Sequence, residues 1–157
     1  MPNFSAPISD LYLDDYQPGA VFEFGPVPVE EREVIAFAKK YDPQPIHTDP
    51  LAAASGPFAG LIASGWHTIG LIMALLVKHY LSPASSMASP GVDEVRWIKP
   101  VRPGDQLRLR VTVVETRRSR TKPDRGVLFS YVEGLNQRDE VVVTLKSMNM
   151  TAVRPLI

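Results

Sequence analysis

The second half of the chain alternates between apolar and polar residues with the period of two that is typical of half-buried antiparallel strands. In QLRLRVTVVET (106–116), arginine and threonine separate apolar side chains at every second position. The segments VFEF (21–24), VDEVRWIKP (92–100), GVLFSYVEGLN (126–136) and EVVVTLKSMNMTAV (140–153) are further strand candidates. The turn-like sequences RPGD and NQRDE lie between some of them. This half of the chain therefore predicts long antiparallel strands.

Two stretches of the first half have the apolar spacing of helices. In VEEREVIAFAKKY (29–41), apolar residues recur at intervals of three and four, and the acidic first turn and basic last turn match the helix dipole. This helix is expected to end near Tyr41, because Asp42 precedes a proline and is driven towards an extended backbone. The second stretch, GWHTIGLIMALLVKHYL (65–81), is apolar nearly all round, which predicts a helix buried on most sides. Its uninterrupted apolar part, Ile69 to Val77, is too short to cross a membrane.

Early helices followed by long strands predict an α+β fold. A curved antiparallel sheet wrapped around a long buried central helix, the hotdog arrangement, would cover the apolar helix with the available strands. The length fits one such domain over residues 1–157. The sheet would leave an edge strand for a second copy to cover, and zero net charge gives little protection against self-association. We therefore expect a homodimer or a larger homo-oligomer.

The composition argues against several classes of function. Seventeen basic residues balance seventeen acidic residues, which argues against general binding to nucleic acid or to a membrane surface. The chain has no cysteine, which excludes disulfides, zinc thiolates, iron–sulfur clusters and cysteine nucleophiles. The N-terminus carries Asp10, Asp14 and Asp15 and has no basic start followed by an apolar run, so it does not resemble a signal peptide. We expect a cytoplasmic protein.

The segment YDPQPIHTDP (41–50) carries two titratable side chains on a stiff piece of chain. Asp42 and His47 lie five positions apart, with Pro43 and Pro45 between them. Residue chemistry alone leaves two interpretations open. The pair could handle protons together, or Asp42 could simply end the preceding helix while His47 is an ordinary hydrogen-bonded histidine.

This segment resembles the signature of the MaoC-like dehydratases, the group of the (R)-specific enoyl-CoA hydratases. The pattern is an Asp, an Asn-Pro two residues on, a His, an Asp-Pro and then a Gly at the start of the central helix. In FAKKYDPQPIHTDPLAAAS…FAGLIASGWHT the matching residues are Asp42, Gln44, Pro45, His47, Asp49 and Gly65. The stretches LDDYQPGAVFEF and VRWIKPVRPGDQLRLRVTV extend the resemblance over nearly the whole chain. One departure stands out, because Gln44 occupies the position of the family's Asn.

The resemblance implies a hotdog fold and a hydratase or dehydratase. The substrate would be an α,β-unsaturated acyl thioester, carried by coenzyme A or by an acyl carrier protein. No cofactor and no metal is expected. The implied site residues are, for catalysis, Asp42, His47 and Gly65 and, for substrate binding, Gln44, Ser64 and Trp66.

The chemistry of hydration suits these residue types. An Asp and a His on one stiff segment can hold a water between them for attack on C3, and the prolines reduce the ordering needed on binding. Negative charge develops on the thioester oxygen as an enolate forms, and a helix N-terminus offers free backbone N–H groups to it. Gly65 opens the predicted helix, and its missing Cβ would let a ligand come close.

Two other functions stay open. A hotdog acyl-CoA thioesterase would use a carboxylate to activate water against the thioester carbonyl. Thioesterases of this fold do not usually show the D-x-x-P-x-H pattern, which favours the hydratase. A non-catalytic subunit that binds acyl thioesters or supports assembly would explain Gln44 as a drifted position.

Several residues near the signature have structural interpretations. Asp49 is expected to cap a short helix that opens at Pro50. Ser64 lacks the G-x-S-x-G context of a nucleophile and would hydrogen-bond near the pocket or cap the long helix. Trp66 and Trp97 are expected in the core or in the pocket wall.

The stretch RRSRTKPDRG (117–126) is basic and links two predicted strands. Arginine clusters suit the phosphates of coenzyme A, so this stretch could bind them. It could equally be a solvated hairpin tip with no ligand.

Overall fold

The fold is a single antiparallel sheet with one long helix against it, described by a computed structural model for residues 3–156. The sheet has the strand order β1-β3-β4-β5-β2. Its strands are β1 (Val21–Pro28), β2 (Gly91–Trp97), β3 (Gln106–Arg118), β4 (Arg125–Leu135) and β5 (Val141–Ala152). The helices are α1 (Glu31–Tyr41), α2 (Pro45–Thr48), α3 (Pro50–Ala54) and α4 (Gly65–His79), and the short 3-10 turns η1 (Ile8–Asp10) and η2 (Leu13–Asp15) precede β1.

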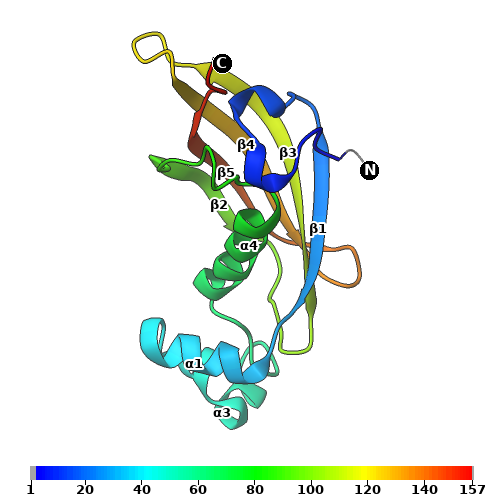
Figure 1. The fold of residues 1–157 in the computed structure, drawn as a ribbon. Coiled ribbons are helices and arrows are strands. Elements are labelled where there is room, and N and C mark those ends of the chain that lie inside the picture. The colour runs from blue at the N-terminus through cyan, green and yellow to red at the C-terminus, as the bar shows by residue number, and fades with distance from the viewer. Residues whose placement is uncertain (1–2, 157) are drawn as a thin grey trace.

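The predicted α+β hotdog arrangement is confirmed. Figure 1 shows α4 lying against the sheet, with α1 and α3 beyond its N-terminal end. The alternation in 106–116 is confirmed up to Val113, because Leu107, Leu109, Val111 and Val113 are fully buried and the polar residues between them are not. Helix and sheet approach closely at Gly134, where a Cβ would lie only 3.0 Å from Cδ1 of Ile72. A side chain there would also collide with Val143 on β5, at 2.8 Å, so Gly134 lets the Ile72 side chain pack directly on the sheet.

The element boundaries follow the sequence with small differences; among them, α4 ends at His79 rather than at 81, and β2 ends at Trp97 rather than at 100. Helix α1 ends at Tyr41 as expected, because the backbone of Asp42, with φ −153° and ψ 67°, leaves the helical conformation before Pro43. Strand β1 continues to Pro28, beyond the predicted 21–24, by pairing with β3 across a register shift. The stiff segment after Asp42 forms one helical turn, α2, whose first residue is Pro45. Proline suits that position because a first-turn N–H has no partner within the helix.

Helix α4 differs from the expectation that it is buried on most sides. Its inner face, with Ile72, Leu75 and Leu76, packs against the sheet. Its opposite face is exposed in the single chain, with Trp66 60%, Met73 45% and Val77 55% exposed. One sheet can bury only one side of a helix, so part of the apolar surface of α4 remains exposed in the single chain. No helix in residues 3–156 is long and apolar enough to cross a membrane.

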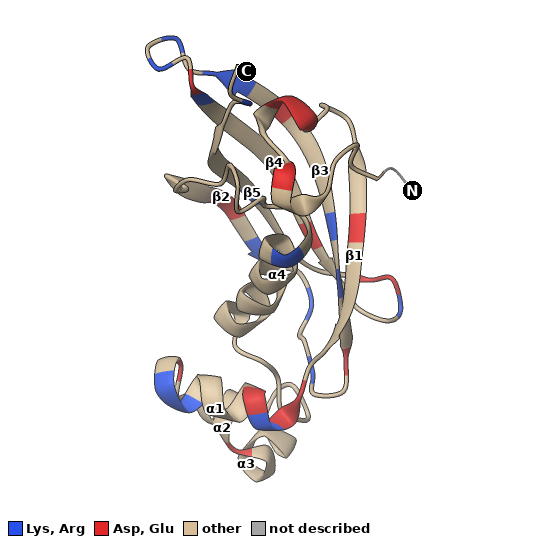
Figure 2. Ribbon diagram, viewed as in Figure 1, with Lys and Arg blue, Asp and Glu red and all other residues tan. Residues whose placement is uncertain are grey.

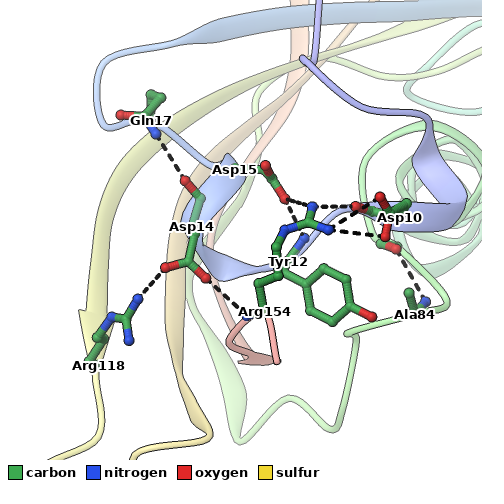
Figure 3. Close-up of polar contacts among 9 residues, drawn as sticks. Asp10, Tyr12, Asp14, Asp15, Gln17, Ala84, Arg118 and Arg154 are labelled. Carbon is green, nitrogen blue, oxygen red and sulfur yellow. Dashed lines mark hydrogen bonds and ion pairs between the residues drawn. The ribbon is translucent and has the colours of Figure 1, made fainter. Parts of the chain in front are cut away.

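An arginine near the C-terminus ties both ends of the chain together. Figure 3 shows the Arg154 guanidinium between the carboxylates of Asp10 and Asp15, at 3.2 Å and 2.9 Å. It also stacks on the Tyr12 ring, with 4.7 Å between the guanidinium carbon and the ring centroid. Asp14 accepts a hydrogen bond from the Arg154 backbone N–H and pairs with Arg118. The three acidic residues of the N-terminus therefore hold η1 and η2 against the last strands.

We expect Arg154→Ala to lower the melting temperature by roughly 2–4 °C at low salt, because one residue serves a network of contacts rather than an isolated ion pair. The loss should shrink in 1 M salt, where exposed charges are screened. Arg138→Ala is the matched control, since Arg138 pairs only with Glu140, two residues away. Equal melting temperatures for the two variants would contradict the assigned role.

Candidate active site

The Asp42 carboxylate is held from two sides at the end of α1. The Gln44 side-chain amide donates to Asp42 Oδ1 at 2.7 Å, and the Ser64 hydroxyl donates to Oδ2 at 2.7 Å. These donors lower the pKa of Asp42, Gln44 contributing most and Ser64 next, and the neighbouring His47 acts in the same direction. Partial burial opposes them and does not reverse the shift. The residue is therefore an anion at neutral pH.

His47 is buried in α2 and its ring orientation is fixed. Its Nδ1 lies 2.7 Å from the backbone oxygen of Ile62. A carbonyl oxygen can only accept, so Nδ1 is the donor of this bond and carries a proton. The other ring nitrogen, Nε2, lies 3.4 Å from Asp42 Oδ2. The Asp42 carboxylate and the Nε2 edge of the His47 ring therefore lie side by side.

The N-terminus of α4 reaches the same place with unused donors. Ser64 stands at the N-cap position, but its hydroxyl bonds to Asp42 instead of capping the helix. Within residues 3–156 no acceptor bonds the backbone N–H of Gly65, Trp66 or His67, and the first N–H with a partner is that of Thr68. These N–H groups and the helix dipole favour negative charge at this end.

A cavity of about 450 Å³ joins these groups. Asp42, His47 and Gly65 line it, together with Thr68 and the indoles of Trp66 and Trp97. The space beside Gly65 is not empty, because a Cβ built there would lie 2.3 Å from Trp97 Nε1. The missing side chain at Gly65 therefore makes room for an indole in this structure.

The site residues predicted from the sequence lie close together, but not all of them line the cavity. Asp42, His47, Gly65 and Trp66 line the cavity, Ser64 lies buried behind it, and Gln44 is exposed and reaches it only through Asp42. Asp49 does not line it and caps α3, as predicted, by accepting bonds from the N–H groups of Leu51 and Ala52.

The basic stretch 117–126 lies elsewhere. Figure 2 shows its blue hairpin tip between β3 and β4 at the opposite end of the molecule from α1. Arg118 pairs with Asp14 there, and Arg117 pairs with Glu115. Within one chain these arginines do not belong to the cavity. The described residues hold no group of His, Asp and Glu side chains suited to a metal ion.

Two contributions escaped sequence reasoning. The Ile62 carbonyl fixes the His47 ring, but a backbone acceptor leaves no mark in residue types. Trp97 was assigned only to core or pocket wall, and its place over Gly65 depends on how the end of β2 meets α4. In the sequence, the only indication of a role for Trp97 in the pocket was its large aromatic side chain within VRWIKP.

Comparison with known proteins identifies the family of this chain. The family model described as the MaoC like domain matches residues 15–129, most of the chain. The chain belongs to the MaoC-like domain family. The resemblance read from the sequence is thereby confirmed.

Individual MaoC-like relatives cover most or part of the chain. A MaoC-like dehydratase from Rhodospirillum rubrum superposes with a TM-score of 0.86 at 38% identity, covering 94% of this chain and all of that one. The uncharacterized protein YdeM of Bacillus subtilis is 30% identical over 82% of this chain and 90% of its own length. The 3-hydroxyacyl-thioester dehydratase Z of Mycobacterium tuberculosis is 36% identical over 56% of this chain, and the match spans 60% of that protein.

Removing the Gln44 amide should raise the pKa of Asp42 towards its ordinary value, because the largest cause of its lowering is lost. A lowered carboxyl pKa keeps Asp42 ionised to more acidic pH, so Gln44→Ala should move the acid limb of kcat/KM to higher pH. Gln17→Ala is the control, since that amide donates to the Asp14 backbone oxygen away from the cavity. An unmoved acid limb in Gln44→Ala would show that Gln44 does not tune Asp42.

Proposed function

We propose that this protein adds water to an α,β-unsaturated acyl thioester, or removes it from the 3-hydroxyacyl thioester, as an (R)-specific enoyl-CoA hydratase or dehydratase. One observation carries the proposal. Asp42 Oδ2 and His47 Nε2 lie 3.4 Å apart, and both residues line one cavity with the uncapped start of α4. Membership of the MaoC-like family and the likeness to a 3-hydroxyacyl-thioester dehydratase support it.

The pair suits a single water as nucleophile. The Asp42 carboxylate accepts hydrogen bonds, and so does Nε2 in the tautomer of His47 that keeps its proton on Nδ1, so a water between them would donate one hydrogen to each. Its remaining lone pairs would then face away from both acceptors, towards C3 of the substrate. As the O–C3 bond forms, one water proton passes to the pair and a proton is delivered to C2, so that one whole water is added. Both groups contact the same water, and either can complete this transfer.

The start of α4 suits the charge that the reaction creates. Attack at C3 moves electron density onto the thioester oxygen, which becomes enolate-like. Backbone N–H groups that are already oriented stabilise such charge without reorganisation. Gly65 and Trp66 supply free N–H groups beside Asp42, because Ser64 leaves them uncapped. The Gly65 N–H is our candidate oxyanion donor.

The test is incubation with crotonyl-CoA. Loss of enoyl absorbance without free thiol is the expected result, and release of thiol would instead indicate a thioesterase. Asp42→Asn and His47→Ala should each lower turnover by at least roughly two orders of magnitude, the size of a lost acid–base contribution. Both should keep their melting temperature within a few degrees, since both side chains line a cavity.

Asp49→Asn is the matched control for Asp42→Asn. It makes the same chemical change seven residues away, at a side chain that caps α3. Asparagine caps helices about as well as aspartate, so turnover and stability should both be retained. Near-normal hydration by Asp42→Asn or by His47→Ala would contradict the assignment. Neither hydration nor thiol release in the parent protein would favour the non-catalytic alternative.

We also infer that the protein is at least a homodimer, with α4 at the contact. The exposed face of α4 presents the apolar stripe Gly70, Met73, Ala74 and Val77, spaced as on one side of a helix. Figure 2 shows this helix almost free of charge, and Lys78 is its only charged residue. Strand β2 ends the sheet beside it with an open edge. A second copy would cover both features at once.

Sedimentation equilibrium at micromolar concentration should give a dimer or larger species. The double variant Met73→Glu/Val77→Glu should shift it towards monomer, because burying two carboxylates in an apolar contact is costly. Val114→Glu is the control, since Val114 is as exposed as Val77, 54% against 55%, but lies on β3. A clean monomer in the parent protein would refute the dimer.

A further inference from the structure

We propose that the Trp97 indole is a gate over the start of α4, and that it must swing away before an acyl thioester can reach the Gly65 N–H. The inference rests on the proposed function for the ligand that passes the gate. It adds a residue outside the family signature and a conformational step. Trp97 would thereby control how tightly the acyl group of the thioester binds.

The indole occupies the space that the glycine leaves. An ideal Cβ on Gly65 would lie 2.3 Å from Nε1, 2.4 Å from Cε2 and 2.9 Å from Cδ1 of Trp97. No side chain fits at residue 65 while the indole keeps this position. A thioester oxygen at the Gly65 N–H brings its neighbouring atoms into the same volume. The indole and the acyl group therefore compete for one place.

Trp97 lies at the end of its strand and at the wall of the cavity. It is the last residue of β2, where it pairs with Val143, and the chain leaves the sheet after it. In the single chain Trp97 is 46% exposed, and it lines the cavity together with Gly65. Its aromatic neighbour is Trp66, whose ring meets it edge to face with centroids 5.4 Å apart. Swinging out gives up that contact and the packing on Gly65 without opening the core.

A fixed wall is the alternative role, and it has the opposite consequence. A wall contacts the acyl chain, so removing it weakens binding. A gate takes the place of the acyl chain, so removing it strengthens binding. Free coenzyme A has no acyl group and should be insensitive to the gate. The affinities of two ligands for one variant therefore separate the roles.

The experiment is calorimetric titration of butyryl-CoA, a saturated thioester that cannot be hydrated, with free coenzyme A as control. Trp97→Ala should bind butyryl-CoA about three- to tenfold more tightly, because the ligand no longer has to break the aromatic contact of Trp97 with Trp66. Trp97→Phe should fall between Trp97→Ala and the parent protein. Affinity for free coenzyme A should not change. Equal or weaker binding of butyryl-CoA by Trp97→Ala overturns the gate.

A stability cycle tests the packing without any ligand. Gly65→Ala should lower the melting temperature by at least about 3 °C, because its Cβ collides with the indole. In the Trp97→Ala background the same change should cost nothing, since alanine is the better helix former. Equal losses in both backgrounds would mean that the indole does not rest on Gly65, which overturns the gate even where ligand binding is intact.

Fluorescence then follows the movement itself. The chain has two tryptophans, so Trp66→Phe leaves Trp97 as the only one. Its emission should change on adding butyryl-CoA and stay constant with free coenzyme A, and constant emission with saturating butyryl-CoA overturns the gate. A coupled stability cycle together with no butyryl-CoA binding by any variant would have another meaning. It would refute the proposed function. It would also refute the gate, because no acyl thioester would then enter the cavity.

Discussion

The site depends on one hydrogen bond, from the Ser64 hydroxyl to Asp42 Oδ2 at 2.7 Å. It joins the C-terminal end of α1 to the N-terminal end of α4, two helix ends that are 22 residues apart in sequence. The bond does two things at once. It helps to keep Asp42 ionised, and it withdraws the serine from its usual task of capping the helix. The carboxylate and the free N–H groups of α4 thus arise from a single contact.

Much of the fold could be predicted, because the patterns that determine it are local in the sequence. Alternation within β3 and the proline after Asp42 depend on neighbouring residues, and both predictions held. The boundaries that shifted depend on distant partners. Strand β1 continues past Phe24 because β3 is there to pair with it, and no local pattern reveals a partner about eighty residues away. The burial of α4 was overstated for the same reason, since an apolar helix does not reveal how many chains cover it.

For the site, residue types could be predicted and contacts could not. Asp42, His47 and Gly65 were found through the family spacing, and the structure brings them to one cavity. The proton position on His47 comes from the Ile62 carbonyl, which any residue at 62 would provide. Gln44 illustrates the limit most clearly. As a departure from the family pattern it suggested a drifted position, whereas its amide bonds directly to the carboxylate.

Gly65 shows why a glycine in a signature can carry two constraints. From the sequence its missing Cβ suggested room for a ligand, and in the structure the same space holds the Trp97 indole. These are not rival explanations, because a volume that must admit a ligand must also be filled or hydrated when the ligand is absent. The indole atom nearest to that space is Nε1, which is a donor only and cannot satisfy the free N–H groups of the helix start. A water in that place would bond to them and would have to be removed by each substrate. An indole at Gly65 thus fills the space without supplying an acceptor, which in the proposed reaction would leave the N–H groups available to the developing oxyanion.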